Sequence, residues 1–398
     1  MTATELAPIN PHVLAWARVE SGWLPEQIAQ SLHVKPERVT AWERGERKPT
    51  LRQVENLARF LHQPLSIFFL PSPPELPPLA AEYRRLPGVQ VGAESPQLRL
   101  ALRQMLNRRE YALNLCEELG APVPTFDAAA HLSESAATVG ARLRALLHVT
   151  VEDQGAWGNG WQAWRTWRNA VESIGILVFQ FNKVAPEEAR GLALLDMPLP
   201  VVGINSKERV PEAKAFTLLH EVVHLMLAAG HEELPALEEK RSGEQWAEVE
   251  RFAESAASHA LVPAAALQQS VDAMGAGPGA WSVPSVRRLA RRFWITPLAT
   301  ATRLRESGVM TWNRYNEWRA EWNQYVATLP VRGGGFATQA EKAINRHGRP
   351  FVQLVLEAMS ANRITSVDAA RYLELKYQHF EQLRGLLSGP TSGAAENG

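Results

Sequence analysis

The residues best suited to chemistry lie in one short stretch, His220-Glu221-Val222-Val223-His224. On an α-helix, residues four apart share a face, so the two histidines can bind one metal ion. The glutamate between them can then reach a water molecule on that metal. This spacing predicts a zinc metallopeptidase in which His220 and His224 are ligands and Glu221 is the catalytic base.

The surrounding residues favour a helix through this motif. Pro211 and Glu212 suit a first helical turn, and Gly230 suits a helix end. An apolar stripe recurs between them at helical spacing, formed by Phe216, Leu219, Val223 and Leu227. The alternative is a helix with two core histidines and a solvated glutamate, which would bind no metal.

A catalytic zinc also needs a third protein ligand and an open position for water. Glu250 is our candidate because it lies in a second predicted helix, 243–262, whose apolar stripe would turn inward. Glu254, one turn further on, is the second choice. His231 is disfavoured because its distance from His224 does not fit the pattern in which a third histidine follows such a motif.

Further segments follow one another in a recognisable order: GILVF at 175–179, EARG at 188–191, PVVGIN at 200–205, FTLLHE at 216–221, and a stretch from Glu250 to LVP at 261–263. Their order and spacing resemble the ImmA/IrrE family of metallopeptidases. The resemblance implies zinc ligands at His220, His224 and Glu250 and a catalytic glutamate at Glu221. Many members have asparagine where this chain has Glu254, a difference that would alter hydrogen bonding around the metal without removing a ligand.

Two apolar runs before the motif, 174–179 and 201–204, are typical of strands. With the helices they predict an α+β fold that is mostly helical and has a small sheet. One strand should form an edge beside the zinc cleft. An extended peptide, such as a flexible loop of a protein substrate, could pair with that edge through main-chain hydrogen bonds.

The amino-terminal residues predict a DNA-binding module. Within 10–70, which suggests about five short helices, segments 25–32 and 36–44 have the lengths and the short connection of a helix-turn-helix. The run AWERGERKPT at 41–50 resembles the Xre class of phage-repressor domains. Val39 and Trp42 should face inward, which leaves these candidate DNA contacts: Lys35, Glu37, Arg38, Thr40, Ala41, Arg44, Arg47 and Lys48.

The expected roles of these contacts differ. Arg38 or Arg44 suits a guanine edge, whereas Lys35, Arg47 and Lys48 suit phosphates. Residues 1–70 carry eight Lys/Arg against seven Asp/Glu, which is a weak positive surplus. A helical module that docks a protein is therefore the alternative.

Composition sets the broader limits. The chain has 398 residues, 45% of them hydrophobic, which suits a globular protein of two or three domains. Its 42 basic and 42 acidic residues cancel, so only local patches can attract nucleic acid. A single cysteine, Cys116, excludes an internal disulfide. The absence of a signal-like or membrane-spanning run in this sequence leads us to expect a cytoplasmic protein.

We expect the following division of the chain. Residues 1–70 form the helix-turn-helix domain and the proline-rich run 71–78 forms a stiff linker. Residues 79–330 form the zinc-peptidase domain with helical flanks; Tyr83-Arg84-Arg85 either anchors the linker or begins this domain. After a glycine-rich hinge, 331–388 forms a small module with three helix candidates, suited to docking or dimerisation, and 389–398 forms a disordered tail.

Two clusters allow two interpretations each. Trp157, Trp161, Trp164 and Trp167 are spaced as one side of a helix, which favours core over a ligand platform. The segment 285–310 contains six arginines and no acidic residue up to position 305. It suits either a second nucleic-acid contact or a basic helical pair packed on the peptidase core. The arginines are Arg287, Arg288, Arg291, Arg292, Arg303 and Arg305.

Together these features predict metal-assisted peptide hydrolysis, in which Glu221 takes a proton from water and passes it to the leaving amine. Tyr83 and His259 are candidates for stabilising the oxyanion. The family resemblance implies limited cleavage of a regulatory protein, typically a DNA-bound repressor, in a stress or prophage response. The competing hypothesis is a non-cleaving transcriptional regulator or antitoxin-like repressor whose zinc domain senses a signal or docks a partner. Nothing suggests a general degradative protease.

Overall fold

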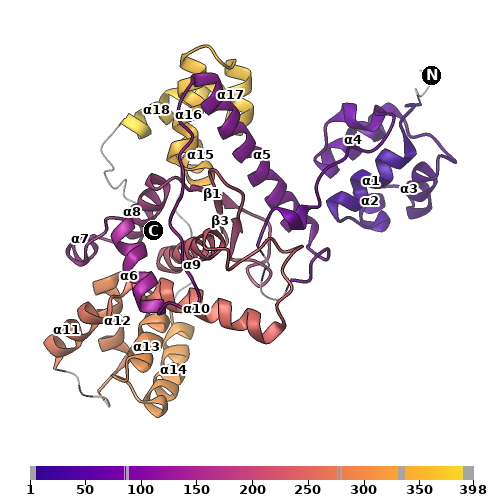
Figure 1. Cartoon of the computed structure of the whole chain (residues 1–398). Helices are drawn as coiled ribbons and strands as arrows, with labels where there is room; N and C mark the ends of the chain where they lie inside the picture. Colours follow the sequence, from indigo (N-terminus) through magenta and orange to yellow (C-terminus); the bar gives the residue numbers. More distant parts are fainter. Residues whose placement is uncertain are drawn as a thin grey trace.

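The computed structural model describes residues 6–84, 86, 89–275, 277, 280–329 and 337–388 (Figure 1). Within these ranges the chain is mostly helical and has one three-stranded sheet, which confirms the α+β class expected from the sequence. The glycine-rich hinge at 331–335 and the tail at 389–398 lie outside the described residues. No helix in the described part of the chain is long and apolar enough to span a membrane.

The amino-terminal module has a hydrophobic core of its own, to which Val39 and Trp42 contribute as predicted. Asn10 and Thr50 cap two of its helices by accepting backbone hydrogen bonds from His12 and Gln53. In Figure 1 this module lies to one side of the rest of the chain. Its elements are α1 (Pro11–Ser21), α2 (Pro25–Leu32), α3 (Pro36–Glu43), α4 (Leu51–Leu61) and the 3-10 turn η1 (Leu65–Phe69).

The sheet has the strand order β1-β3-β2. β1 (Leu177–Phe181) pairs in parallel with β3 (Val201–Asn205), which pairs in antiparallel with β2 (Gly191–Leu194). The predicted first strand begins too early, because Ile174 ends the preceding helix α8 (Gly160–Ser173). Strand β2 was not predicted, because four residues give too short an alternation to recognise.

The two faces of the sheet contribute to two separate cores, since alternate strand residues point to opposite sides. Val178, Val202 and Ile204 pack in the core shared with α8, α9 (Pro211–Ala229) and α10 (Gly243–Leu261). Leu177, Phe179 and Val201 pack on the other side. The first core also includes residues from α6 (Ala136–Leu146), α11 (Ala264–Met274), α12 (Val283–Phe293), α13 (Pro297–Glu306) and α14 (Trp312–Ala327).

The second core joins the long helix α5 (Pro96–Leu119) to the carboxy-terminal helices, which lie beside it in Figure 1. Four α-helices are present where three were expected: α15 (Gln339–His347), α16 (Arg349–Ser360), α17 (Ser366–Tyr372) and α18 (Phe380–Ser388), with the 3-10 turn η3 (Tyr377–His379). The chain reverses at Asn362 and Glu374, which adopt positive φ angles of 56° and 47°. Such reversals at residues other than glycine are hard to predict from sequence.

The tryptophan cluster is core, as expected, but it does not lie on one helix. Trp164 and Trp167 are buried on α8, whereas Trp157 ends the short helix α7 (Val151–Ala156). Trp157 packs edge-on against Trp167, with ring centroids 5.7 Å apart. The break at Gly158 and Asn159 before α8 explains why the helical spacing was misleading.

The arginine-rich segment divides into two groups. Arg303 is buried. Arg287 lies over the ring of Tyr325, and Arg305 lies over the rings of Trp312 and Tyr315, all on α14. These three take part in packing, as the structural interpretation requires. Arg288, Arg291 and Arg292 remain exposed.

Candidate metal centre

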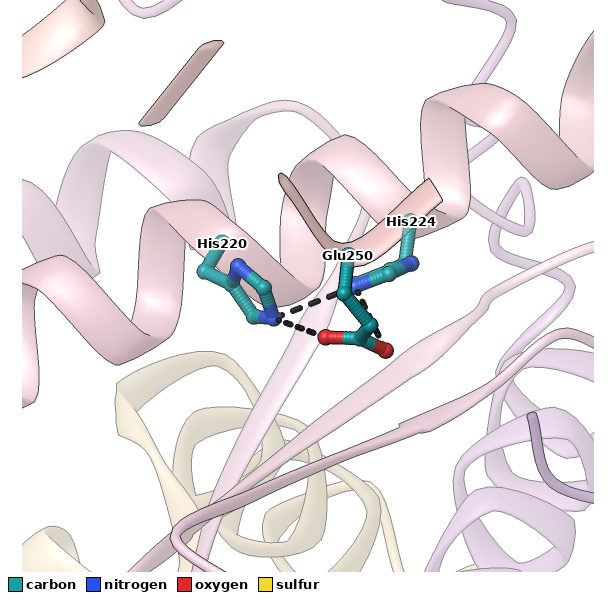
Figure 2. Close-up of side chains that lie close together, drawn as sticks. All are labelled: His220, His224 and Glu250. Atoms are coloured by element: carbon teal, nitrogen blue, oxygen red, sulfur yellow. Dashed lines mark hydrogen bonds and ion pairs between the residues drawn. The ribbon is translucent and has the colours of Figure 1, made fainter. Parts of the chain in front are cut away.

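Helices α9 and α10 bring together the three side chains predicted as zinc ligands (Figure 2). The Nε2 atoms of His220 and His224 lie 3.1 Å apart. Glu250 Oε2 lies 3.3 Å from His220 Nε2, and Glu250 Oε1 lies 3.7 Å from His224 Nε2. A metal bound at about 2.0–2.1 Å to each atom requires ligand atoms at roughly such separations.

The donor set fits a zinc ion of the catalytic kind. Two imidazoles and one carboxylate make three protein ligands, which is the usual number where a fourth position is left for water or substrate. Their ligand atoms lie within 4.8 Å of one another. His224 is fully buried, whereas His220 and Glu250 are partly accessible. The accessible side of the cluster is where a substrate could approach.

Glu233 contacts the other ring nitrogen of His224, and the sequence did not identify it as part of the site. Its Oε2 lies 2.7 Å from His224 Nδ1, and both side chains are buried. A carboxylate in this position holds the ring so that Nε2 points to the metal. Glu233 reaches it because the chain reverses after α9 at His231, whose φ is 59°. The sequence alone shows only two adjacent glutamates beyond Gly230.

The carboxylate of Glu233 also raises the pKa of His224. Burial and the charge of Arg84 lower the pKa of His224, but Glu233 and Glu250 outweigh them and raise the pKa to about 9. A metal ion must displace that proton to bind Nε2. Metal binding at this cluster should therefore release a proton and strengthen as the pH rises.

Arg84 is the other residue that the sequence did not place in the site. Its Nε and Nη2 donate to Glu221 Oε2 and Oε1 at 2.9 and 3.1 Å, and its Nη1 donates to Glu250 Oε1 at 2.8 Å. Arg84 and Glu221 are each only 2% exposed. Burial raises the pKa of Glu221, but the charge and hydrogen bonds of Arg84 outweigh it and leave the pKa below its usual range.

The remaining candidates near the site receive no structural support. Glu254 is exposed on α10 and His231 is exposed beyond α9, and neither belongs to the three-residue cluster. The Tyr83 hydroxyl is hydrogen-bonded to Glu94. His259 Nδ1 lies 2.8 Å from the Ser255 carbonyl oxygen of its own helix. These hydrogen bonds join Tyr83 and His259 to residues outside the cluster.

The predicted DNA contacts lie on α3 and in the turn that follows it. Lys35, Glu37, Arg38, Arg44, Arg47 and Lys48 are exposed, whereas Thr40 and Ala41 are half-buried. The carboxylate of Glu46 lies 3.8 Å from Arg44, and both side chains are largely exposed. This surface is accessible to a partner, but few contacts fix its side chains.

Comparison with known families gives two matches, in separate segments of the chain. Residues 14–68 match the helix-turn-helix family model, and residues 171–305 match the model described as IrrE N-terminal-like domain, an M78 peptidase family. No curated protein matches the chain. The chain therefore joins an Xre-type helix-turn-helix to an ImmA/IrrE-like domain, as its motifs predicted. The second match includes α9, α10 and the metal cluster, whereas Arg84 lies between the two matched segments.

Proposed function

We propose that this chain is a DNA-binding zinc metallo-endopeptidase that makes a limited cut in a regulatory protein, such as a transcriptional repressor, in a stress or prophage response. The observation that carries this proposal is the position of Glu221. Its buried carboxylate lies next in sequence to His220 and shares Arg84 with Glu250, which in turn contacts both histidines. A structural zinc site would not require this additional carboxylate.

Zinc held by His220, His224 and Glu250 would supply a Lewis acid and a more acidic water. Glu221 would be the base that takes a proton from the attacking water and then gives it to the leaving nitrogen. Glu233 keeps the His224 ring in the orientation that ligation requires. His220 and Glu250 are the partly exposed members of the cluster, so a peptide bond would approach from their side.

The helix-turn-helix would place the peptidase beside its substrate. A protein bound at a promoter is rare in free solution, but a peptidase tethered to nearby DNA meets it at a much higher effective concentration. DNA and a protein substrate are thus the two proposed partners, and the cytoplasm is the proposed location.

A second candidate, a regulator that cuts nothing, is favoured by one specific contact. Arg84 engages both carboxylate oxygens of Glu221. A base in that state cannot readily accept a proton from water. On this alternative the cluster would sense zinc or stabilise the domain, and Glu221 would serve only as the partner of Arg84.

Replacing Glu221 by glutamine separates the two functions. Cells expressing the wild type, Glu221→Gln or the control Glu248→Gln would be compared by labelling of new protein amino termini. Glu248 is an exposed glutamate on α10. We expect cleavage products with the wild type and the control but not with Glu221→Gln, while all three proteins retain zinc. Identical cleavage products in all three would reject the peptidase. Identical transcriptional regulation by all three proteins, with no cleavage products, would favour the non-cleaving regulator.

A further inference from the structure

The segment 80–84 follows the proline-rich linker: its first two residues end the 3-10 turn η2 (Leu79–Ala81), and Tyr83 forms an isolated antiparallel bridge with Leu194 of the edge strand β2. Arg84 N donates to the Ala193 carbonyl of β2 at 3.1 Å. On the other side of the segment, Ala236 N donates to Tyr83 O at 2.7 Å and Leu237 N donates to Ala80 O at 2.9 Å. The segment is therefore held between the edge strand and the chain around 235–237 by main-chain hydrogen bonds.

Strand β2 passes directly beside the catalytic base. A Cβ atom placed on Gly191 would overlap Glu221 Oε1, so only a residue without a side chain allows this approach. An extended chain paired with the free edge of β2 thus runs past Glu221. That edge is where main-chain pairing would hold a peptide substrate, and segment 80–84 already pairs with it.

The side chain of Arg84 also keeps the carboxylate of Glu221 from accepting a proton. It engages both oxygens of Glu221 and one oxygen of Glu250. Charge-assisted, two-pronged hydrogen bonds of this kind are strong, and here they are buried. Glu221 cannot act as a free base while they persist.

We propose that residues 80–84 are an intramolecular pseudosubstrate, which occupies the peptide-binding edge of β2 and holds Glu221 through Arg84 until the segment is displaced. This inference rests on the proposed peptidase function, because it describes how the same site is kept inactive. Arg84 lies outside both family matches, which suits a control element separate from the matched peptidase-like domain.

A chain of polar contacts joins this segment to the amino-terminal module. The Tyr83 hydroxyl bonds to Glu94, and Glu94 Oε2 lies 3.0 Å from Arg99 Nη2. Arg99 Nη1 in turn donates to the Val19 and Glu20 carbonyls, at 3.3 and 3.4 Å, at the end of α1. Movement of the helix-turn-helix relative to α5 would disturb these contacts. A ligand of the amino-terminal module is therefore the expected source of release.

The test uses the zinc-loaded full chain and a fluorescein-labelled peptide with the sequence of residues 79–84, LAAEYR. If the segment competes for the edge, Arg84→Ala should bind this peptide at least about tenfold more tightly than the wild type, because a tethered competitor has a high effective concentration. A labelled peptide with alanine in place of Arg84 should bind the variant more weakly. Arg251→Ala, which removes an exposed arginine of α10, should behave as the wild type.

A second variant covers the case in which Arg84→Ala fails to fold, since it leaves Glu221 and Glu250 without their buried partner. Arg99→Ala keeps Arg84 and removes the connection from Glu94 to α1, while Arg103 still bonds to Glu20. It should accelerate amide hydrogen exchange at Ala236 and Leu237 severalfold and raise peptide affinity by a smaller factor than Arg84→Ala. Unchanged exchange and unchanged peptide affinity in folded variants would overturn the pseudosubstrate.

The outcomes also separate this inference from the proposed function. Tighter peptide binding by the variants without cleavage of any protein would support the pseudosubstrate and reject the peptidase. Cleavage by the wild type at the same rate as by Arg84→Ala would support the peptidase and reject the pseudosubstrate.

Discussion

The candidate metal centre and the surface around α3 are both suited to a partner, and they differ in how firmly their side chains are held. His224, Glu221 and Glu233 are buried, and each contacts a charged or polar neighbour. Around α3, by contrast, Arg38, Arg47 and Lys48 are exposed. The side chains of the metal centre are therefore held in position before a metal ion or a substrate binds.

This difference indicates what each site can specify. A preformed cluster of donors selects by element and coordination geometry. A flexible basic surface gains affinity from phosphates and selects only through the few side chains that reach base edges. Changes at the metal centre should therefore have large effects on binding, and changes around α3 should have smaller ones.

Removing a ligand should give the largest effect. We expect Glu250→Ala and His224→Ala to weaken zinc binding by at least about 100-fold, because one of three ligands contributes a large share of a binding free energy on the order of 10 kcal/mol. Competition with a fluorescent chelator measures this, with Glu248→Ala as the control. Unchanged affinity in Glu250→Ala would show that the third ligand lies elsewhere.

Replacing Glu233 by glutamine should have the next largest effect. Loss of this carboxylate behind His224 should lower zinc affinity about 10- to 100-fold. The pH dependence should also change. Wild-type affinity should rise with pH until the proton with a pKa of about 9 on His224 is lost. In the variant that proton leaves at lower pH, so its affinity should level off earlier. Parallel profiles would contradict the role of Glu233.

Adding a methyl group beside Glu221 tests how closely the site is packed. Gly191→Ala should lower the free energy of unfolding by about 1–3 kcal/mol, because the new Cβ overlaps Glu221 and Thr217 side chains. Urea denaturation measures the change. Gly243→Ala is the matched control, since its Cβ would meet nothing within 4 Å. An unchanged stability of Gly191→Ala would mean that β2 and α9 can separate without cost.

Variants on α3 should give the smallest and most graded effects. On a site selected from random-sequence DNA, Arg44→Ala or Arg38→Ala should cost about 1–3 kcal/mol and relax the preference at one base pair. Lys48→Ala should weaken binding to all sequences alike and reduce the salt-dependence slope by about one. Fluorescence anisotropy at several salt concentrations distinguishes these patterns. Failure of the wild type to bind any selected DNA would favour the protein-docking alternative.

The predictable part of this protein is what depends on local spacing. The position of His220 and His224 on one helical face follows from the four-residue interval, and α2 and α3 follow from their first-turn prolines and apolar positions. Glu250 was found because it lies on a second helix with an inward stripe. Each of these inferences depends only on the residue spacing within a single helix.

What could not be predicted depends on contacts between distant segments. Arg84 reaches Glu221 across 137 positions of sequence, through main-chain pairing with β2. Glu233 reaches His224 only because His231 adopts a left-handed conformation. Neither a long-range pairing nor a reversal at a residue other than glycine has a clear sequence signal. The reversals at Asn362 and Glu374 likewise explain the extra carboxy-terminal helix.

The most direct test of this account is the zinc content and zinc coordination of the wild-type chain, measured by mass spectrometry and X-ray absorption. The account predicts about one zinc per chain, with two imidazole nitrogens and oxygen ligands at about 2.0–2.2 Å. A chain that takes up no zinc under zinc-replete conditions would contradict the metallopeptidase and leave a DNA-binding regulator.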